Sequence, residues 1–160
     1  MREKLVSLFL ASSVFLGTVA EAKNQSWQLA QVQSVSSQVE FLNGLWEGTY
    51  KCSQGLTKLR LIIKAKSTTE IDAVFWFSAH PSNPNVPSGR FRMKGALEVF
   101  TPQDIPNILE LKATTWMNRP AGYSTVDLLG EISLSEQRIT GSVLSNSSSC
   151  STFSVVKREG

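Results

Sequence analysis

The residues that most often carry chemistry are sparse in this sequence. His80 is its single histidine, and Cys52 and Cys150 are its only cysteines. A hydrolytic triad needs a nucleophile, a base and an orienting group held together, and no Gly-x-Ser-x-Gly elbow is present. His80 precedes Pro81, which is typical of a loop residue rather than of a general base. One histidine and two cysteines that pair with each other also supply too few ligands for a zinc site.

Carboxylates offer no clearer catalytic pattern. Glycoside hydrolysis uses two carboxylates that face each other, and the strand pattern described below indicates no inward-facing pair. There is also no glycine-rich loop of the phosphate-binding type. We therefore predict a non-enzymatic protein without a cofactor, and a hydrolase stays open as an alternative. The acidic residues that fall mostly on outward faces are Glu47, Asp72, Glu98, Glu110, Asp127 and Glu131.

The two cysteines favour a disulfide, because a lone pair of cysteines in an oxidising compartment usually forms one. A Cys52–Cys150 bridge would close a loop of about 99 residues and contribute about 4 to 5 kcal/mol in the chain-entropy model. Two buried free thiols are the alternative.

The first residues are typical of an export leader. Arg2 and Lys4 precede an uncharged, mostly apolar run over 5–19, and Ala20-Glu21-Ala22 has the small residues that a signal peptidase accepts. The apolar run is about 15 residues, shorter than the roughly 20 of a membrane span, although a retained anchor is the alternative. We predict a signal peptide over 1–22, cleaved after Ala22, and a secreted or periplasmic protein.

The rest of the chain has the length of one domain. The formal net charge of the 160 residues is only +3, which does not suggest a nucleic-acid partner. Residues 23–40 are polar and rich in Gln and Ser, which predicts a flexible lead-in, with a possible short helix near 38–43. Residues 41–160 form the predicted single β-domain, which we expect to be a monomer.

From about residue 45 the apolar side chains alternate with polar ones, as expected for strands with one buried face. Leu59, Leu61 and Ile63 share one side of a strand whose other side is basic. The pattern predicts eight strands, over 45–52, 56–66, 70–79, 89–100, 107–116, 124–135, 138–146 and 150–157.

Short connections favour antiparallel neighbours, and a closed up-and-down barrel would hide the apolar face and remove both edges. Cys52 ends the first predicted strand and Cys150 begins the last, which fits a barrel where these two strands are neighbours. Phe153 and Val155 have the opposite parity to Cys150, so we expect Cys150 at the irregular start of its strand. A β-sandwich is the alternative fold.

In such a barrel the odd-numbered loops gather at one end. These loops contain three prolines between His80 and Ser88, and the run Asn118 to Tyr123 preceded by Trp116. Rigid loops with amides, a guanidinium and aromatic rings can form a ligand site at a barrel mouth, although turn formers are common in any loop. The residues predicted to bind ligand are Gln54, His80, Asn83, Asn85, Trp116, Asn118, Arg119 and Tyr123.

The outward faces of two predicted strands are basic, with Lys58, Arg60, Lys64 and Lys66 on 56–66 and with Arg90, Arg92 and Lys94 on 89–100. This stripe is either a surface for anionic envelope polymers or a solvated face without a partner.

Gly44-Leu45-Trp46 resembles the Gly-x-Trp motif of calycins, the lipocalin and avidin group of barrels. The resemblance implies that Trp46 packs near the closed end under a basic residue from the last strand, where Lys157 and Arg158 lie, and we assign this structural role to Arg158. It implies a fold and no ligand.

Two further resemblances concern export. The spaced residues from Trp46 to Cys52, Pro87 to Gly95 and Cys150 to Phe153 look like those of an exported bacterial domain of unassigned function. Tyr50-x-Cys52-x-x-Gly55 with a late Cys150 is similar to periplasmic c-type lysozyme inhibitors, but their Ser-Gly-x-x-Tyr loop is not reproduced after Ser88-Gly89.

Together these observations predict an extracytoplasmic, non-enzymatic barrel whose loop-rich mouth holds a small molecule or a macromolecular partner of the cell envelope or exterior. An inhibitor of a cell-wall hydrolase is the second possibility. The interior decides which ligand is possible: a hollow barrel would admit a small apolar or amphipathic molecule. An interior filled by Phe75, Phe77, Phe91, Met93 and Leu128 would leave the rim to a macromolecule.

Overall fold

The computed structural model describes residues 18–100, 105–146 and 149–159. The chain divides into two compact units, residues 1–33 and 34–160. The described part of the first unit belongs to helix α1, which covers Thr18–Leu42. The second unit contains the end of α1 and all the strands.

Helix α1 covers the whole segment that we predicted as a flexible lead-in, and so the helix near residue 38 is much longer than expected. No Gly or Pro occurs between Thr18 and Leu42, and such a sequence does not interrupt a helix even without a clear apolar stripe. Gly44, with a φ of +124°, ends it. Among the described residues, no helix is both long and apolar enough for a membrane span.

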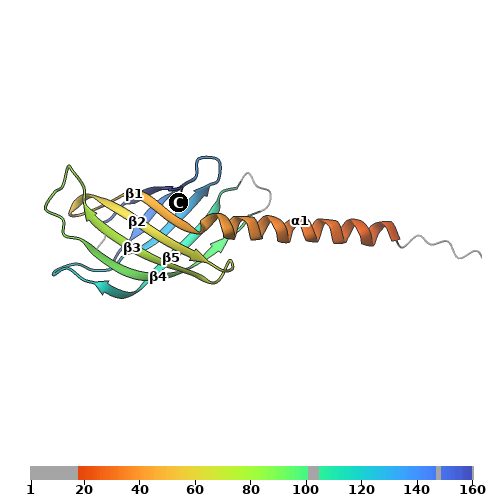
Figure 1. Ribbon diagram of the computed structural model, residues 1–160, viewed down its shortest axis with the longest axis horizontal. Coiled ribbons are helices and arrows are strands. Elements are labelled where there is room, and N and C mark those ends of the chain that lie inside the picture. Colours follow the sequence, from red (N-terminus) through yellow and green to blue (C-terminus); the bar gives the residue numbers. More distant parts are fainter. Residues whose placement is uncertain (1–17, 101–104, 147–148, 160) are drawn as a thin grey trace, which may run out of the picture. The chain divides into compact units, whose positions relative to one another are not determined.

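The strands form a closed antiparallel barrel in which each strand pairs with the next and β8 pairs with β1 (Figure 1). The predicted all-β, eight-stranded up-and-down barrel is therefore confirmed, and the sandwich is excluded. The strands are β1 Gly44–Cys52, β2 Gly55–Ala65, β3 Ile71–Ala79, β4 Gly89–Glu98, β5 Asn107–Asn118, β6 Asp127–Ser133, β7 Arg138–Leu144 and β8 Thr152–Lys157.

The predicted alternation is visible in the burial of each strand. On β2, residues from Thr57 to Ile63 alternate between buried and exposed positions, and β4 does the same from Gly89 to Lys94. The buried members form one apolar core inside the barrel. Leu134 lies within the predicted strand 124–135, where its parity with Leu128 and Ile132 would place it inward. It is instead exposed, because β6 ends at Ser133 and the chain turns there.

A disulfide between Cys52 and Cys150 links β1 to the segment before β8, as predicted. It lies at one end of the β1–β8 pairing that closes the barrel, which we call the closing seam. Cys52 is the last residue of β1, whereas Cys150 lies two residues before β8. Phe153 and Val155 are buried inside the barrel. Cys150 has the opposite parity, and it forms the bridge from the irregular segment that precedes the strand. The amide of Ser151 donates to the carbonyl of Lys51 at 2.9 Å, which fixes this irregular segment against β1.

The end of α1 closes the barrel at the end opposite the disulfide. Trp46 is fully buried, and its indole N–H donates to the carbonyl of Leu42 at 2.9 Å. The ammonium of Lys157 lies 4.7 Å from the ring centre of Phe41 and 5.8 Å from that of Trp46. The cation over Trp46 is thus Lys157. Arg158, to which we assigned this role, instead pairs with Glu47 at 2.8 Å.

Glu47 accepts from two guanidiniums, Arg158 at 2.8 Å and Arg60 at 2.6 Å. The hydrogen bond from Arg158 holds the pKa of this carboxyl below its ordinary value of 4.5, with a further contribution from Arg60. A carboxyl whose pKa is lower in the folded state stabilises the fold above its unfolded pKa, and this stabilisation disappears as the pH falls through the folded pKa.

We therefore expect Glu47→Gln to be less stable than the wild type at pH 7, with a difference that shrinks below about pH 4.5. Urea unfolding at several pH values measures it. Glu131→Gln is the control, since Glu131 is exposed and has no ion pair among the described residues. A Glu47→Gln deficit that stays constant between pH 7 and pH 3 would contradict the assignment.

Candidate ligand-binding site

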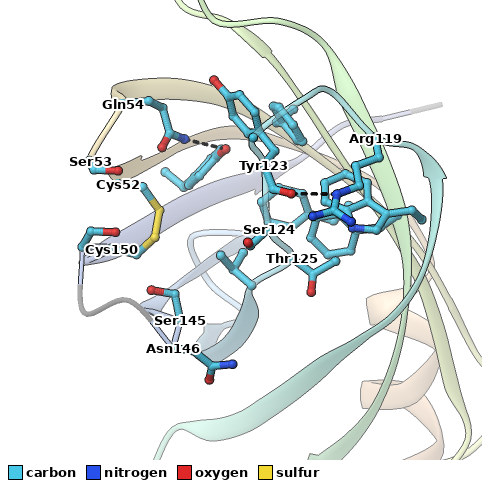
Figure 2. Close-up of a pocket in the computed structure, with 18 residues that line it drawn as sticks. Cys52, Ser53, Gln54, Arg119, Tyr123, Ser124, Thr125, Ser145, Asn146 and Cys150 are labelled. Carbon is cyan, nitrogen blue, oxygen red and sulfur yellow. Dashed lines mark hydrogen bonds between the residues drawn. A yellow bond between two sulfur atoms is a disulfide. The ribbon is translucent and has the colours of Figure 1, made fainter.

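The barrel opens at its disulfide end into a cavity of about 800 Å³. Figure 2 shows the residues of three connections around it: the β1–β2 turn, the β5–β6 loop and the β7–β8 loop. These are the first, fifth and seventh connections, which the sequence placed together at one end. The lining residues are Tyr50, Cys52, Ser53, Gln54, Phe75, Phe77, Phe91, Trp116, Arg119, Gly122, Tyr123, Ser124, Thr125, Val126, Ser145, Asn146, Ser149 and Cys150.

The floor of the cavity is a packed group of aromatic rings. Phe75 and Phe91 stack with their centres 4.7 Å apart, and Phe77 stacks on Tyr123 at 5.3 Å. Tyr50 meets Phe75 edge to face at 5.2 Å. Met93 and Leu128 are buried but do not line the cavity. The interior is thus filled at its centre and hollow at the mouth. This arrangement is intermediate between the hollow barrel and the filled barrel that we considered from the sequence.

Trp116 reaches the cavity because β5 is irregular. Leu109 and Leu111 are buried on the inward side of β5, so regular alternation would direct residue 116 outward. The β4–β5 register shifts between the pairs Phe91↔Trp116 and Met93↔Ala113, where β5 contains one extra residue. Such a bulge reverses the side on which later residues lie. The Trp116 ring therefore packs against Phe91, with ring centres 5.0 Å apart.

A second irregularity follows directly. Arg90 pairs with Asn118 and Phe91 pairs with Trp116, so β5 again contains one extra residue between two successive pairs. Asn118 consequently does not join Trp116 in the cavity. It lines a small pocket on the outer wall of the barrel, together with Trp76, Ser88, Gly89 and Arg90.

Arg119 is the one charged side chain among the described residues that line the cavity. Its Nε donates to the carbonyl of Tyr123 at 2.9 Å, and its guanidinium carbon lies 5.9 Å from the centre of the Trp116 ring. Its remaining N–H groups have no partner in the described part of the chain. Arg119 is held from one side and can donate to a ligand from the other.

The hydroxyl of Tyr50 lies at the inner edge of the polar rim. The amide of Gln54 donates to it at 2.9 Å. Burial raises the pKa of the Tyr50 phenol well above its ordinary value of 10.0, because the phenolate would be poorly solvated there. Tyr50 therefore stays neutral at physiological pH and can serve as a hydrogen-bond donor.

The structure brings four of the eight predicted binding residues together: Gln54, Trp116, Arg119 and Tyr123 all line the cavity. Asn118 lies on the outer wall, as described above. Asn83 joins two loops, since its amide donates to the carbonyl oxygens of Gln54 and Leu56. Asn85 is exposed and lines no cavity among the described residues.

His80 forms a local contact in the β3–β4 loop. Its Nδ1 lies 2.7 Å from the hydroxyl of Ser82 and accepts from the amide of Ser82 at 3.2 Å. A nitrogen that accepts from a backbone N–H is engaged in the turn itself. In the described ranges no carboxylate orients the imidazole, and no group of three potential metal ligands occurs.

Several lining residues were not on the predicted list, including Tyr50, Ser124, Thr125, Ser145 and Asn146. The inward parity of Tyr50 with Cys52 could have indicated the first of these, since both are buried on β1. The other four lie in the connections after β5 and β7, which are odd-numbered loops that we expected at the mouth. Their side-chain orientation depends on where β6 starts and β7 ends, and the sequence pattern extended both strands too far.

Comparisons with family models, with curated proteins and with solved structures found no match to this chain. The eight-stranded antiparallel barrel is compatible with a calycin-like fold.

Proposed function

We propose that this protein is an extracytoplasmic, non-enzymatic binding protein that holds a small amphipathic molecule at the mouth of its barrel. The observation that carries the proposal is the mouth cavity of about 800 Å³, with an aromatic floor and a polar rim. Pockets that bind small molecules are mostly between 300 and 1,000 Å³ and combine apolar walls with a few polar groups. The Cys52–Cys150 disulfide supports a location in an oxidising compartment.

The lining favours a ligand with an apolar ring system and an anionic or hydrogen-bonding group. Trp116 and Tyr123 are only partly buried, so each offers part of a ring to a ligand. Arg119 provides a positive charge near them, and no acidic side chain lines the cavity among the described residues. An anionic group near Arg119 and an apolar body against the rings would satisfy both kinds of surface.

The filled centre of the barrel limits how deep the ligand goes. Phe75, Phe77 and Phe91 are each at most 2 % exposed and pack on one another. A long chain cannot thread between them without separating these rings. The ligand that fits this cavity is compact and lies above the phenylalanines, between the β1–β2 turn and the β5–β6 loop.

Two fluorescent probes test the site, because they differ mainly in one charge. Anilinonaphthalene sulfonate carries a naphthalene and an anionic group, whereas N-phenylnaphthylamine is its neutral relative. We expect both to bind saturably with enhanced fluorescence. Trp116→Ala should raise the Kd of both probes about tenfold through loss of ring contact.

Arg119→Met should raise the Kd of the sulfonate about tenfold and change the Kd of the neutral probe less than about twofold. Arg138→Met is the matched control, since Arg138 pairs with Glu136 and lies outside the cavity. Absence of saturable binding, or equal Kd values for wild type and both site variants, would overturn the proposal. Inhibition of a lysozyme at a near-stoichiometric ratio without probe binding would favour the inhibitor alternative instead.

A further inference from the structure

The outer surface of β2, β3 and β4 has a regular arrangement of cations around one indole. In the strand registers, Trp76 on β3 lies directly between Arg60 on β2 and Arg90 on β4. The next outward row is Ile62, Val74 and Arg92, and the one after it is Lys64, Asp72 and Lys94. We call this surface the basic face, and its members are Lys58, Arg60, Ile62, Lys64, Asp72, Val74, Trp76, Arg90, Arg92 and Lys94.

The charge of the barrel is concentrated on this side. Residues 55–98, which form β2 to β4, contain seven basic and three acidic residues. Residues 107–157, which form β5 to β8, contain four of each. The small net charge of the chain is therefore unevenly distributed: the half of the barrel formed by β2 to β4 is positive, and the half formed by β5 to β8 is balanced.

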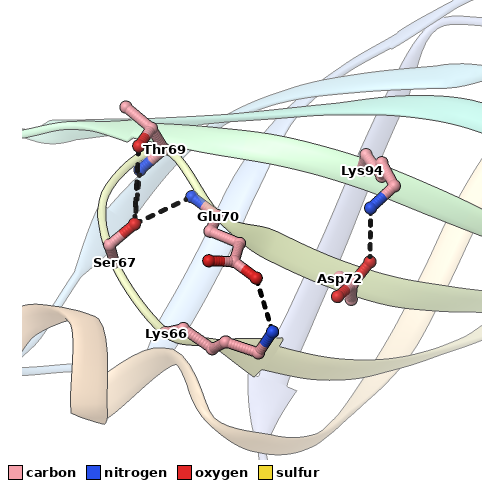
Figure 3. A network of polar contacts seen from close by, with 6 residues as sticks. All are labelled: Lys66, Ser67, Thr69, Glu70, Asp72 and Lys94. Carbon is pink, nitrogen blue, oxygen red and sulfur yellow. Dashed lines mark hydrogen bonds and ion pairs between the residues drawn. The ribbon is translucent and has the colours of Figure 1, made fainter.

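The acidic residues neutralise only part of the basic face. Lys94 pairs with Asp72 at 3.1 Å, and beside the basic face Lys66 pairs with Glu70 in the β2–β3 turn (Figure 3). Arg60 pairs with Glu47 and also lies over the Trp76 ring, 5.5 Å from its centre. Of the six cations of the basic face, four have no carboxylate partner in the described part of the chain: Lys58, Lys64, Arg90 and Arg92.

A small pocket of about 180 Å³ opens beside the indole, lined by Trp76, Ser88, Gly89, Arg90 and Asn118. The indole N–H donates to the hydroxyl of Ser88 at 3.0 Å, and the amide of Asn118 donates to the carbonyl of Ser88 at 3.2 Å. These bonds hold the walls in place. The pocket combines one aromatic surface, one guanidinium and an amide, and its volume suits a single sugar ring.

We propose that the basic face binds a linear acidic polysaccharide, with one sugar ring beside Trp76 and its carboxylates on the arginines of β4. Arg90 and Arg92 lie on the same side of the strand, about 7 Å apart. A guanidinium can bind a carboxylate through two parallel hydrogen bonds. A polymer lying across β2 to β4 would also meet Lys58 and Lys64.

Two other polyanions fit the face less well. Of its three apolar members, Val74 and Trp76 are half-buried and only Ile62 is exposed, so the face lacks the group of protruding apolar side chains that enters a lipid surface. The net charge of the chain is only +3, whereas a domain that binds nucleic acid is usually strongly basic. A sugar polymer instead needs a shallow aromatic surface with nearby hydrogen-bonding groups, which the pocket beside Trp76 provides.

The test compares polygalacturonate with poly-L-glutamate of equal charge, which has carboxylates but no sugar rings. Binding is measured by calorimetry at low and at physiological salt. We expect polygalacturonate to bind the wild type at least about fivefold more tightly than poly-L-glutamate, with affinity that falls as salt increases. Trp76→Leu should abolish this preference.

The double variant Arg90→Gln/Arg92→Gln should weaken polygalacturonate binding at least about tenfold and reduce its salt dependence. Both side chains are exposed, so this variant tests the site even if Trp76→Leu does not fold. Arg138→Gln, on the balanced half, should bind as the wild type does. Equal affinity for the two polymers, tighter binding of a DNA oligonucleotide or of phosphatidylglycerol vesicles, or no loss in the double variant would overturn the proposal.

Discussion

The double substitution Cys52→Ala/Cys150→Ala should lower the free energy of unfolding by about 4 to 5 kcal/mol. The disulfide joins residues separated by 98 positions, so it removes much of the conformational freedom of the unfolded chain. Such a loss is a large fraction of the total stability of an ordinary domain. Urea unfolding followed by circular dichroism measures it.

The loss should be largest along the closing seam. β1 pairs with β8 over only five residue pairs, from Trp46↔Lys157 to Tyr50↔Phe153, whereas β1 pairs with β2 over nine. The bridge lies at one end of the short ladder. We therefore expect amide protection in β8 to fall more than in the β2–β3 hairpin when hydrogen exchange is measured on the double variant.

A reductant provides the matched control. The wild type treated with a phosphine should unfold at the urea concentration of the double variant, and the double variant should not respond to the phosphine. A stability loss below about 1 kcal/mol would contradict the loop-closure account. So would equal loss of protection in β8 and in the β2–β3 hairpin, because the bridge would then not act through the seam.

The strands could be predicted from the sequence because their information is local. On β2, Leu59, Leu61 and Ile63 alternate with exposed charged or apolar residues, and one buried face requires this period of two. The barrel followed from the number of strands and from the two cysteines at the ends of the first and last ones. Each step needed only the composition of one strand and the lengths of the connections.

Features that depend on two elements at once could not be predicted in this way. The inward position of Trp116 results from a register shift between β4 and β5, and neither strand alone encodes it. The choice of Lys157 over Arg158 for the Trp46 ring depends on parity at the end of β8 and on Glu47, which binds Arg158. Helix α1 was missed for a different reason: its sequence has no clear apolar period, so the spacing of its apolar residues did not indicate a helix.

The need for glycine at two positions inside the barrel also depends on two strands at once. Gly48 and Gly141 lie where neighbouring backbones come so close that no side chain fits. A Cβ on Gly48 would lie 1.9 Å from the carbonyl oxygen of Ser154, and one on Gly141 would lie 2.0 Å from that of Leu129. A small barrel needs such close approaches where strands bend most strongly. The sequence shows glycines in strands but not which backbone lies against them.

Gly48→Ala should therefore destabilise the protein by about 3 kcal/mol or more. The added methyl would overlap the β8 backbone at Ser154 and Val155, and backbone cannot move aside as a flexible side chain does. The β1–β8 seam must separate locally or the barrel must change its curvature. Urea unfolding measures the loss, and hydrogen exchange should show it first in β8.

Gly122→Ala separates this steric cost from a conformational one. Gly122 has a φ of +80° but no atom within 4 Å of a new Cβ, so its substitution should cost only about 1 kcal/mol through backbone strain. Gly48 does not have a positive φ, and its cost should come from the clash alone. Equal losses in the two variants, or a loss below about 1 kcal/mol for Gly48→Ala, would mean that the seam can widen freely. The disulfide and the cavity rim beside it would then be more mobile than the binding proposal requires.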